Sequence, residues 1–158
     1  MISSNLCGNV PVKGSYADLY LHNVNDGLGK PLSHCSKEEV ATYAMDLACV
    51  YLEKCGLEVI GRDWQSKLGG ADIECRDGRR AVLVEVRPSA RDSKDCYEEP
   101  IEIKVGPRSR KKYRESTMSY FSKHAALDSV RYDVIGMRIY SGHDAKLRHI
   151  VGAFGYEQ

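Results

Sequence analysis

The chain has 158 residues, of which 28% are charged, and its formal net charge is +1. This length predicts a single domain with a proper core, and so small a net charge favours no class of partner, so that a nucleic-acid site would have to come from local clustering of basic residues. No apolar run approaches the length of a membrane span, and Met1 does not open a signal peptide, so we expect a cytoplasmic protein with no membrane contact.

The first part of the chain carries scattered glycine, asparagine, serine and aspartate, with weak apolar runs around residues 16–20 and 28–32. We expect an irregular N-terminal arm over residues 1–35, with an added short strand as the alternative. The folded domain is expected over residues 36–158.

A helix is predicted over about residues 37–55. Ser36 and Glu39 form a capping box, in which the serine hydroxyl accepts from the amide of Glu39 and the carboxylate reaches back to the amide of Ser36. Apolar residues then recur at helical spacing over residues 40–52. Gly56 follows as a C-terminal cap signal.

Residues 57–64 are predicted to form a strand, and residues 69–88 a hairpin of two short strands. The turn is expected at Asp77-Gly78, because an Asp-Gly pair between β-rich runs is a strong signal for a two-residue hairpin loop. In that register Asp72 lies opposite Leu83.

The two faces of this hairpin differ in chemistry, because side chains alternate between faces along each strand. One face is uniformly apolar and should pack on a core; it holds Ala71, Ile73, Cys75, Val82, Val84 and Val86. The other face gathers polar side chains, namely those of Asp72, Glu74, Glu85 and Arg87.

Asp72 and Glu85 are expected to be diagonal neighbours on the polar face, roughly 7 Å apart at the backbone. Two carboxylates at that reach could share a divalent cation through oxygen ligands. A plain solvated face is the alternative. A three-residue bulged turn would flip the relative faces and separate the two carboxylates.

The next stretch, residues 89–104, is polar and irregular and is expected to form a mobile loop beside the carboxylate face. Gly106-Pro107 opens a second predicted helix, since proline suits a first turn. The outer faces of this helix carry the one clear basic cluster of the chain: Arg108, Arg110, Lys111, Lys112, Arg114 and Lys123. Contact with nucleic-acid phosphates is the sharper interpretation, and a solvated basic helix face is the other.

Two more strands are predicted, over residues 131–139 and, shorter, over residues 147–151. The order of elements is helix, three strands, helix, two strands. A helix that crosses between strands implies a mixed sheet with helices packed against it. The expected fold class is therefore α/β, with a mixed central sheet flanked by helices.

Short motifs at matching spacing accompany this order of elements over about residues 39–158. They are Asp46-Leu47-Ala48, Tyr51-Leu52, Gly56, Asp63-Trp64, Gly69, Asp72, Asp77-Gly78, Val84-Glu85-Val86, Arg131-Tyr132-Asp133-Val134, Arg148-His149-Ile150 and Ala153-Phe154. No single motif is specific, but their order and spacing together are. The chain resembles the restriction-endonuclease-like nucleases with the PD-(D/E)-x-K motif and, more closely, the small bacterial YraN family, an uncharacterised group often described as endonucleases.

The resemblance implies a metal-dependent DNA endonuclease whose cofactor is Mg²⁺ or Mn²⁺. Asp72 and Glu85 would match the metal-binding carboxylates of the motif, and Arg87 takes the place of its lysine in the catalytic set. The implied partner is DNA, with branched DNA among the candidate substrates, and a homodimer is left open. The alternative is a catalytically impaired nucleic-acid-binding or interaction module on the same fold.

Four polar positions depart from the family pattern. The glutamate before the first aspartate is Gly70 here, the expected helix glutamate is Met45, the motif lysine is Arg87, and a lysine usual at the start of the second helix is Ser109. Arginine is effectively never deprotonated, so Arg87 cannot act as a general base, although it could orient water or stabilise phosphate charge. Asp46 or Glu74 could compensate for the missing carboxylate.

Overall fold

The computed structural model describes residues 16–21, 29–91, 99–141 and 144–157. In chain order the elements are β1 (Tyr16–Leu21), the short 3₁₀ helix η2 (Leu32–His34), α1 (Lys37–Lys54), β2 (Glu58–Gln65), β3 (Gly70–Asp77), β4 (Arg80–Arg91), α2 (Pro107–Lys123), β5 (Ser129–Tyr140) and β6 (Ala145–Glu157). β1 is the short strand that was the alternative to a wholly irregular arm. Neither described α-helix has the length and apolar character that crossing a membrane requires.

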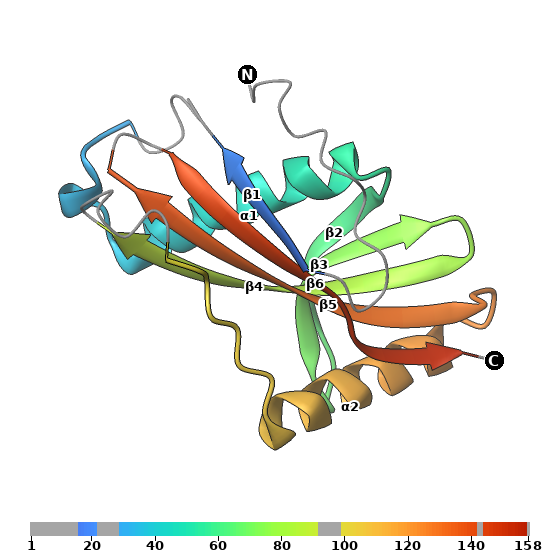
Figure 1. Ribbon diagram of the computed structural model, residues 1–158. Coiled ribbons are helices and arrows are strands. Elements are labelled where there is room, and N and C mark those ends of the chain that lie inside the picture. Colours follow the sequence, from blue (N-terminus) through green and yellow to red (C-terminus); the bar gives the residue numbers. More distant parts are fainter. Residues whose placement is uncertain (1–15, 22–28, 92–98, 142–143, 158) are drawn as a thin grey trace.

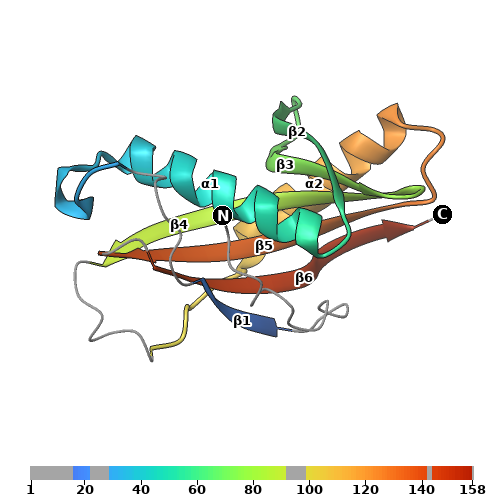
Figure 2. The ribbon, with the colours of Figure 1, turned by 90° about the horizontal axis from the view of Figure 1, so that it is seen from above.

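The strands form one mixed sheet in the order β1-β6-β5-β4-β3-β2. β4 and β5 are parallel, and every other neighbouring pair is antiparallel. α2 makes the crossover between β4 and β5, and the two helices lie on opposite faces of the sheet (Figures 1 and 2). The predicted α/β class and the order helix, three strands, helix, two strands are confirmed, with β1 added at the β6 edge.

α1 begins and ends where its capping signals predict. Ser36 Oγ accepts from the amide of Glu39 at 3.1 Å, and the Glu39 carboxylate accepts from the backbone of Ser36, which completes the capping box. The helix ends at Lys54. Gly56 follows with a φ of +90°, a left-handed conformation that favours glycine at a helix C-terminus.

The β3–β4 hairpin has the predicted polar and apolar faces but not the predicted turn. Gly78 and Arg79 form the loop, and Asp77 pairs with Arg80. Gly78 has a φ of +59°, which suits the first central position of a type II′ turn. The predicted Asp77-Gly78 turn is therefore wrong by one residue. Because this changes the pairing register by two, the side chains keep their partition between the faces.

β4 runs further than the sequence pattern predicts. It stays paired with β5 as far as Arg91 with Tyr140. The prediction that residues 89–104 are an irregular loop is therefore wrong for residues 89–91, which parallel pairing with β5 holds in an extended conformation. Part of that predicted loop, residues 92–98, lies outside the described residues.

β6 is longer than the predicted strand over residues 147–151. Gly152 has a φ of +71°, and the pairing with β5 shifts there, from Val134 with Ile150 to Tyr132 with Phe154. Such a bulge leaves extra residues on one strand and lets the ladder resume beyond it. The sequence prediction stopped at the glycine that allows β6 to continue.

Two apolar clusters fill the space between the sheet and the helices. The cluster under α1 contains most of the predicted apolar hairpin face: Ile73, Cys75, Val82, Val84 and Val86. The cluster under α2 contains Leu83 with Tyr113, Tyr120 and Tyr132. Ala71 was predicted on the α1 side and belongs to the α2 cluster instead, because β3 leaves β4 beyond Ile73 and stays only with β2.

Candidate functional site

The separation of β3 from β4 at Asp72 creates the candidate site. The last β3–β4 pair joins Ile73 to Val84, whereas β3 stays paired with β2 as far as Gly70. Beyond the separation, the amide of Val86 donates to Asp72 Oδ2 at 2.7 Å. The Asp72 carboxylate thus accepts from a backbone amide of β4 that would have bonded to a carbonyl of β3 had the β3–β4 ladder continued.

The observed register brings Asp72 beside Glu85 on the face that α2 covers. Asp72 precedes Ile73 and Glu85 follows Val84, so each carboxylate lies one residue beyond the last β3–β4 pair rather than at the predicted diagonal positions within the ladder. Burial raises the pKa of Asp72 above its usual value, the Val86 amide opposes this rise, and the charge of Glu85 adds to it. The predicted shared face is observed, while the role of the pair as metal ligands stays a prediction.

Three donors converge on the carboxylate of Glu85, whose side chain is 17% exposed. Oε2 accepts from the Tyr113 hydroxyl at 2.6 Å and from Arg87 Nε at 3.0 Å. Oε1 accepts from Lys112 Nζ at 2.7 Å. Burial alone would raise the pKa of Glu85, but the hydrogen bonds from Lys112 and Tyr113 lower it below its usual value. The two carboxylates therefore have pKa values shifted in opposite directions.

Arg87 is held by four acceptors. Besides Glu85, its Nη1 donates to the carbonyl of Lys104 at 2.7 Å, and its Nη2 donates to the hydroxyls of Tyr113 at 2.8 Å and Ser109 at 3.4 Å. The guanidinium thus joins β4 to the segment before α2 and to the first turns of α2. The structure places this predicted catalytic residue where it positions Glu85, with Ser109, one of the departures from the family pattern, among its acceptors.

The predicted basic cluster on α2 divides into two parts. Lys112 turns into the site and pairs with Glu85. The other predicted nucleic-acid-binding residues are exposed on α2: Arg108, Arg110, Lys111 and Arg114. None of these four takes part in the ion pairs found among the described residues. Their role in binding nucleic acid stays a prediction.

An open cavity of about 380 Å³ adjoins Asp72. Asp72 and Lys112 line it together with the loop over residues 65–70. The cavity is large enough for a small hydrated ion or a phosphate oxygen to reach Asp72.

The two glycines of that loop leave no room for side chains. A Cβ at Gly70 would lie 2.7 Å from the carbonyl oxygen of Trp64, and one at Gly69 would collide with Ser116 Oγ. The carboxylate that is missing at position 70 therefore cannot be added without a shift of the backbone.

Neither of the two carboxylates that could compensate joins the pair. Asp46 binds Arg62 at 2.7 Å on the exposed surface, and Glu74 accepts from the Tyr120 hydroxyl at 2.8 Å. In the part of the chain that the structure describes, no group of three or more histidine, cysteine, aspartate or glutamate side chains could hold a metal ion. A metal here would rest on two carboxylates.

The oxygens of Asp72 and Glu85 nevertheless fit a weakly held Mg²⁺ or Mn²⁺. The Val86 amide donates to Asp72 Oδ2, and Tyr113 and Arg87 donate to Glu85 Oε2. A cation would therefore bind Oδ1 of Asp72 and Oε1 of Glu85, and the ammonium of Lys112 now holds Oε1. Mg²⁺ commonly keeps several waters and binds through one or two carboxylates plus phosphate oxygens of the substrate. The donor set matches that description.

Tyr113 and Asp63 contribute to the site without having been singled out as site residues from the sequence. Tyr113 is fully buried and stacks on Tyr132 at 4.3 Å between ring centroids. Burial and the bond to Glu85 raise the pKa of Tyr113 to about 12, so it stays a proton donor at neutral pH.

Asp63 has a φ of +56°, the one positive value among the described non-glycine residues. Burial raises the pKa of Asp72, and the negative charge of Asp63 raises it further.

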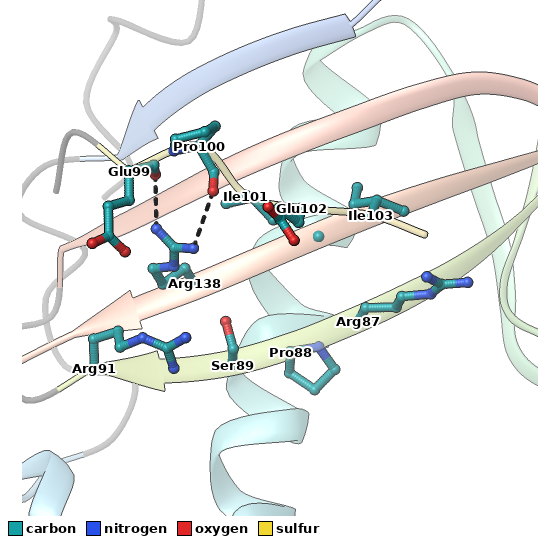
Figure 3. A pocket seen from close by; sticks show the side chains of 11 residues that line it. Arg87, Pro88, Ser89, Arg91, Glu99, Pro100, Ile101, Glu102, Ile103 and Arg138 are labelled. Carbon is teal, nitrogen blue, oxygen red and sulfur yellow. Dashed lines mark hydrogen bonds between the residues drawn. The ribbon is translucent and has the colours of Figure 1, made fainter. Parts of the chain in front are cut away.

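A groove of about 500 Å³ borders the site through Arg87 and continues along β4. In Figure 3, Arg87 and Arg91 lie toward its two ends, and Arg138 donates to the carbonyl oxygens of Glu99 at 2.9 Å and Pro100 at 3.4 Å. The carboxylates of Glu99 and Glu102 also line the groove, so its charge is mixed.

The sequence of this chain is similar to those of several bacterial proteins. The model of the Uncharacterised protein family UPF0102 matches residues 45–137, which include the site from Asp72 to Tyr113. A UPF0102 protein of Geobacter sulfurreducens is 31% identical over 110 residues, which cover 69% of this chain and 83% of that protein. UPF0102 proteins of Acidothermus cellulolyticus and Frankia casuarinae are 25% and 28% identical, each over 75% of this chain and over 96% and 98% of their own lengths. The chain therefore belongs to the uncharacterised protein family UPF0102, which is the YraN family.

Proposed function

We propose that this protein is a metal-dependent nuclease that acts on DNA, with Asp72 and Glu85 as the ligands of Mg²⁺ or Mn²⁺. The observation that supports this most strongly is the placement of the two carboxylates on neighbouring strands at the point where β3 leaves β4, close enough for the charge of Glu85 to act on Asp72. Their pKa values shift in opposite directions, and such shifts concentrate at functional sites. The metal, when bound, would polarise the scissile phosphate and lower the pKa of its bound water.

The protein groups around the pair act by positioning it. The Val86 amide fixes Asp72 through Oδ2, and Tyr113 and Arg87 fix Glu85 through Oε2. The remaining oxygen of each carboxylate is thereby presented in a fixed orientation. Arg87 carries a permanent charge and cannot accept a proton, so its contribution is to hold Glu85.

DNA would be bound along α2. Four exposed basic residues of this helix can neutralise phosphates: Arg108, Arg110, Lys111 and Arg114. The same helix carries Lys112 and Tyr113, which contact Glu85. A strand that follows the basic residues would therefore pass close to the carboxylate pair.

The test is cleavage of branched, flapped and linear DNA with Mn²⁺ by the wild type and by Asp72→Asn. We expect the substitution to abolish metal binding and cleavage together, because it removes one of two ligand charges. Asp46→Asn is the matched control, since Asp46 is a carboxylate paired with Arg62 on the exposed surface. Cleavage that survives in Asp72→Asn would overturn the proposal.

A nucleic-acid-binding module without catalysis is the second candidate. Two observations favour it: Gly70 has no room for the missing carboxylate, and four of the five N–H groups of Arg87 donate to protein acceptors. DNA binding that persists in EDTA, together with no cleavage in Mn²⁺, would support this candidate over the nuclease.

A further inference from the structure

Glu85 has one oxygen that a metal ion can reach. Tyr113 and Arg87 both donate to Oε2, at 2.6 Å and 3.0 Å. Neither donor withdraws easily, because Tyr113 is fully buried and Arg87 is held by three further acceptors. At Oε1 the hydrogen bond comes from Lys112. A cation that binds Glu85 must therefore take the oxygen that Lys112 occupies.

Lys112 is placed to interact with both carboxylates. Its ammonium lies 2.7 Å from Glu85 Oε1, and it lines the same cavity as Asp72. Burial raises the pKa of Asp72, while the positive charge of Lys112 acts to lower it. The lysine side chain is 46% exposed, and its flexible stem allows the ammonium to move into solvent.

We propose that Lys112 occupies the cation position between Asp72 and Glu85 and competes there with the divalent metal. The inference rests on the proposed function, because it requires these two carboxylates to bind metal. Without metal, Lys112 balances part of the charge of the pair. When metal enters, the ammonium leaves Oε1 for the open cavity. The ion pair and the bound metal exclude each other, so breaking the ion pair strengthens metal binding.

The perturbation is Lys112→Met, which removes the ammonium and keeps an unbranched apolar stem. An ion pair with a half-exposed partner is weak, and loss of a nearby positive charge also relieves repulsion of the metal. We therefore expect Mn²⁺ to bind about threefold to tenfold more tightly. Lys111→Met is the matched control, because it loses the same charge from the preceding residue of α2 and Lys111 is exposed.

Affinities are measured by titrating Mn²⁺ and following the electron paramagnetic resonance signal of the free ion, with thermal unfolding to confirm that each variant folds. Tighter binding by Lys112→Met than by Lys111→Met, abolished when Asp72→Asn is added, supports the inference. Equal Asp72-dependent affinities in the wild type and both lysine variants would overturn it and leave the metal site intact. Absence of such binding in every variant would overturn the inference and the metal site together. Tighter binding by Lys112→Met with no DNA cleavage by any variant would support the inference and refute the nuclease.

Discussion

Replacing Tyr113 with phenylalanine removes a single hydroxyl from the centre of the site. That hydroxyl donates to Glu85 Oε2 at 2.6 Å and accepts from Arg87 Nη2 at 2.8 Å. The phenylalanine ring can keep the stacking on Tyr132, so the loss is confined to these two hydrogen bonds. A hydrogen bond to a charged group contributes about 1.5–3 kcal/mol. We expect Tyr113→Phe to lower the free energy of unfolding by about that amount, and Tm by roughly 3–12 °C.

The same substitution should change the pH dependence of stability. Because its donors hold the pKa of Glu85 below the usual value, the folded state binds this proton less tightly than the unfolded chain does. The ionised Glu85 therefore stabilises the folded state. This stabilisation is present above the pKa that Glu85 has in the unfolded chain, and it is lost as the pH falls through its pKa in the folded state. Without the Tyr113 hydroxyl the pKa of Glu85 rises, so the stability difference between wild type and variant should be largest near neutral pH and narrow in acid.

Urea denaturation near neutral pH and at a pH of about 4 measures this difference. Tyr120→Phe is the matched control, because the buried Tyr120 also donates its hydroxyl to a carboxylate, that of Glu74 at 2.8 Å. Both variants should lose stability, and only Tyr113→Phe should alter the affinity for Mn²⁺. Two results would refute the role of the Tyr113 hydroxyl in holding Glu85. One is a Tyr113→Phe protein as stable as the wild type at neutral pH, and the other is an equal effect of the two substitutions on Mn²⁺ affinity.

Three further perturbations test the framework around the site. Asp133→Asn should lower the free energy of unfolding by about 3–5 kcal/mol in urea denaturation, because this fully buried carboxylate pairs with Arg131 and His149. Arg87→Lys should lower it by about 1–3 kcal/mol without increasing cleavage in the Mn²⁺ assay, because an ammonium cannot span the acceptors that the guanidinium joins. The last perturbation reverses three exposed basic residues of α2 to glutamate: Arg110, Lys111 and Arg114. It should weaken DNA binding and reduce the slope of log affinity against log salt by about 2–3.

Each of these expectations has an outcome that contradicts it. An Asp133→Asn protein as stable as the wild type would mean that the buried network adds nothing to folding. Higher cleavage by an Arg87→Lys protein as stable as the wild type would mean that residue 87 takes part directly in catalysis. Lys123→Glu, at the far end of α2, is the control for the charge reversals. If it lowers the salt slope as much per charge as the triple change, binding is not localised near the site.

The hairpin shows how far the sequence pattern could predict the site. Side-chain alternation has a period of two, so a register error of two leaves the faces unchanged. For that reason the prediction that Asp72 and Glu85 share one face holds although the predicted Asp77-Gly78 turn is wrong by one residue. The exact register of the hairpin was not predictable in the same way. It depends on whether Gly78, which has the positive φ, takes the first or the second central position of the turn.

The chemistry of the carboxylate pair depends on contacts that no local pattern encodes. Lys112 and Tyr113 reach Glu85 from 27 and 28 residues further along the chain. From the sequence, Lys112 belongs with the other basic residues of the helix, because charge periodicity tells which side of a helix is polar but not which turn of the helix contacts the sheet. Arg87 was assigned through its place in the motif, whereas its acceptors from residue 104 onward position it as the support of Glu85.

The packing of Gly70 decides how the departures from the family pattern should be tested. Its carbonyl accepts from the Tyr132 hydroxyl at 2.6 Å, and a Cβ on it would approach the carbonyl of Trp64 to 2.7 Å. Adding a glutamate there requires β2 and β3 to move apart. Gly70→Glu would therefore disturb the separation of β3 from β4 that positions Asp72. A failure of that variant to cleave DNA would follow from the backbone whether the native site is active or not. Lys112, in contrast, touches the pair through a half-exposed ammonium, and its removal leaves the strands in place. Comparing metal affinity after Lys112→Met therefore probes the two carboxylates on the backbone that the chain actually has.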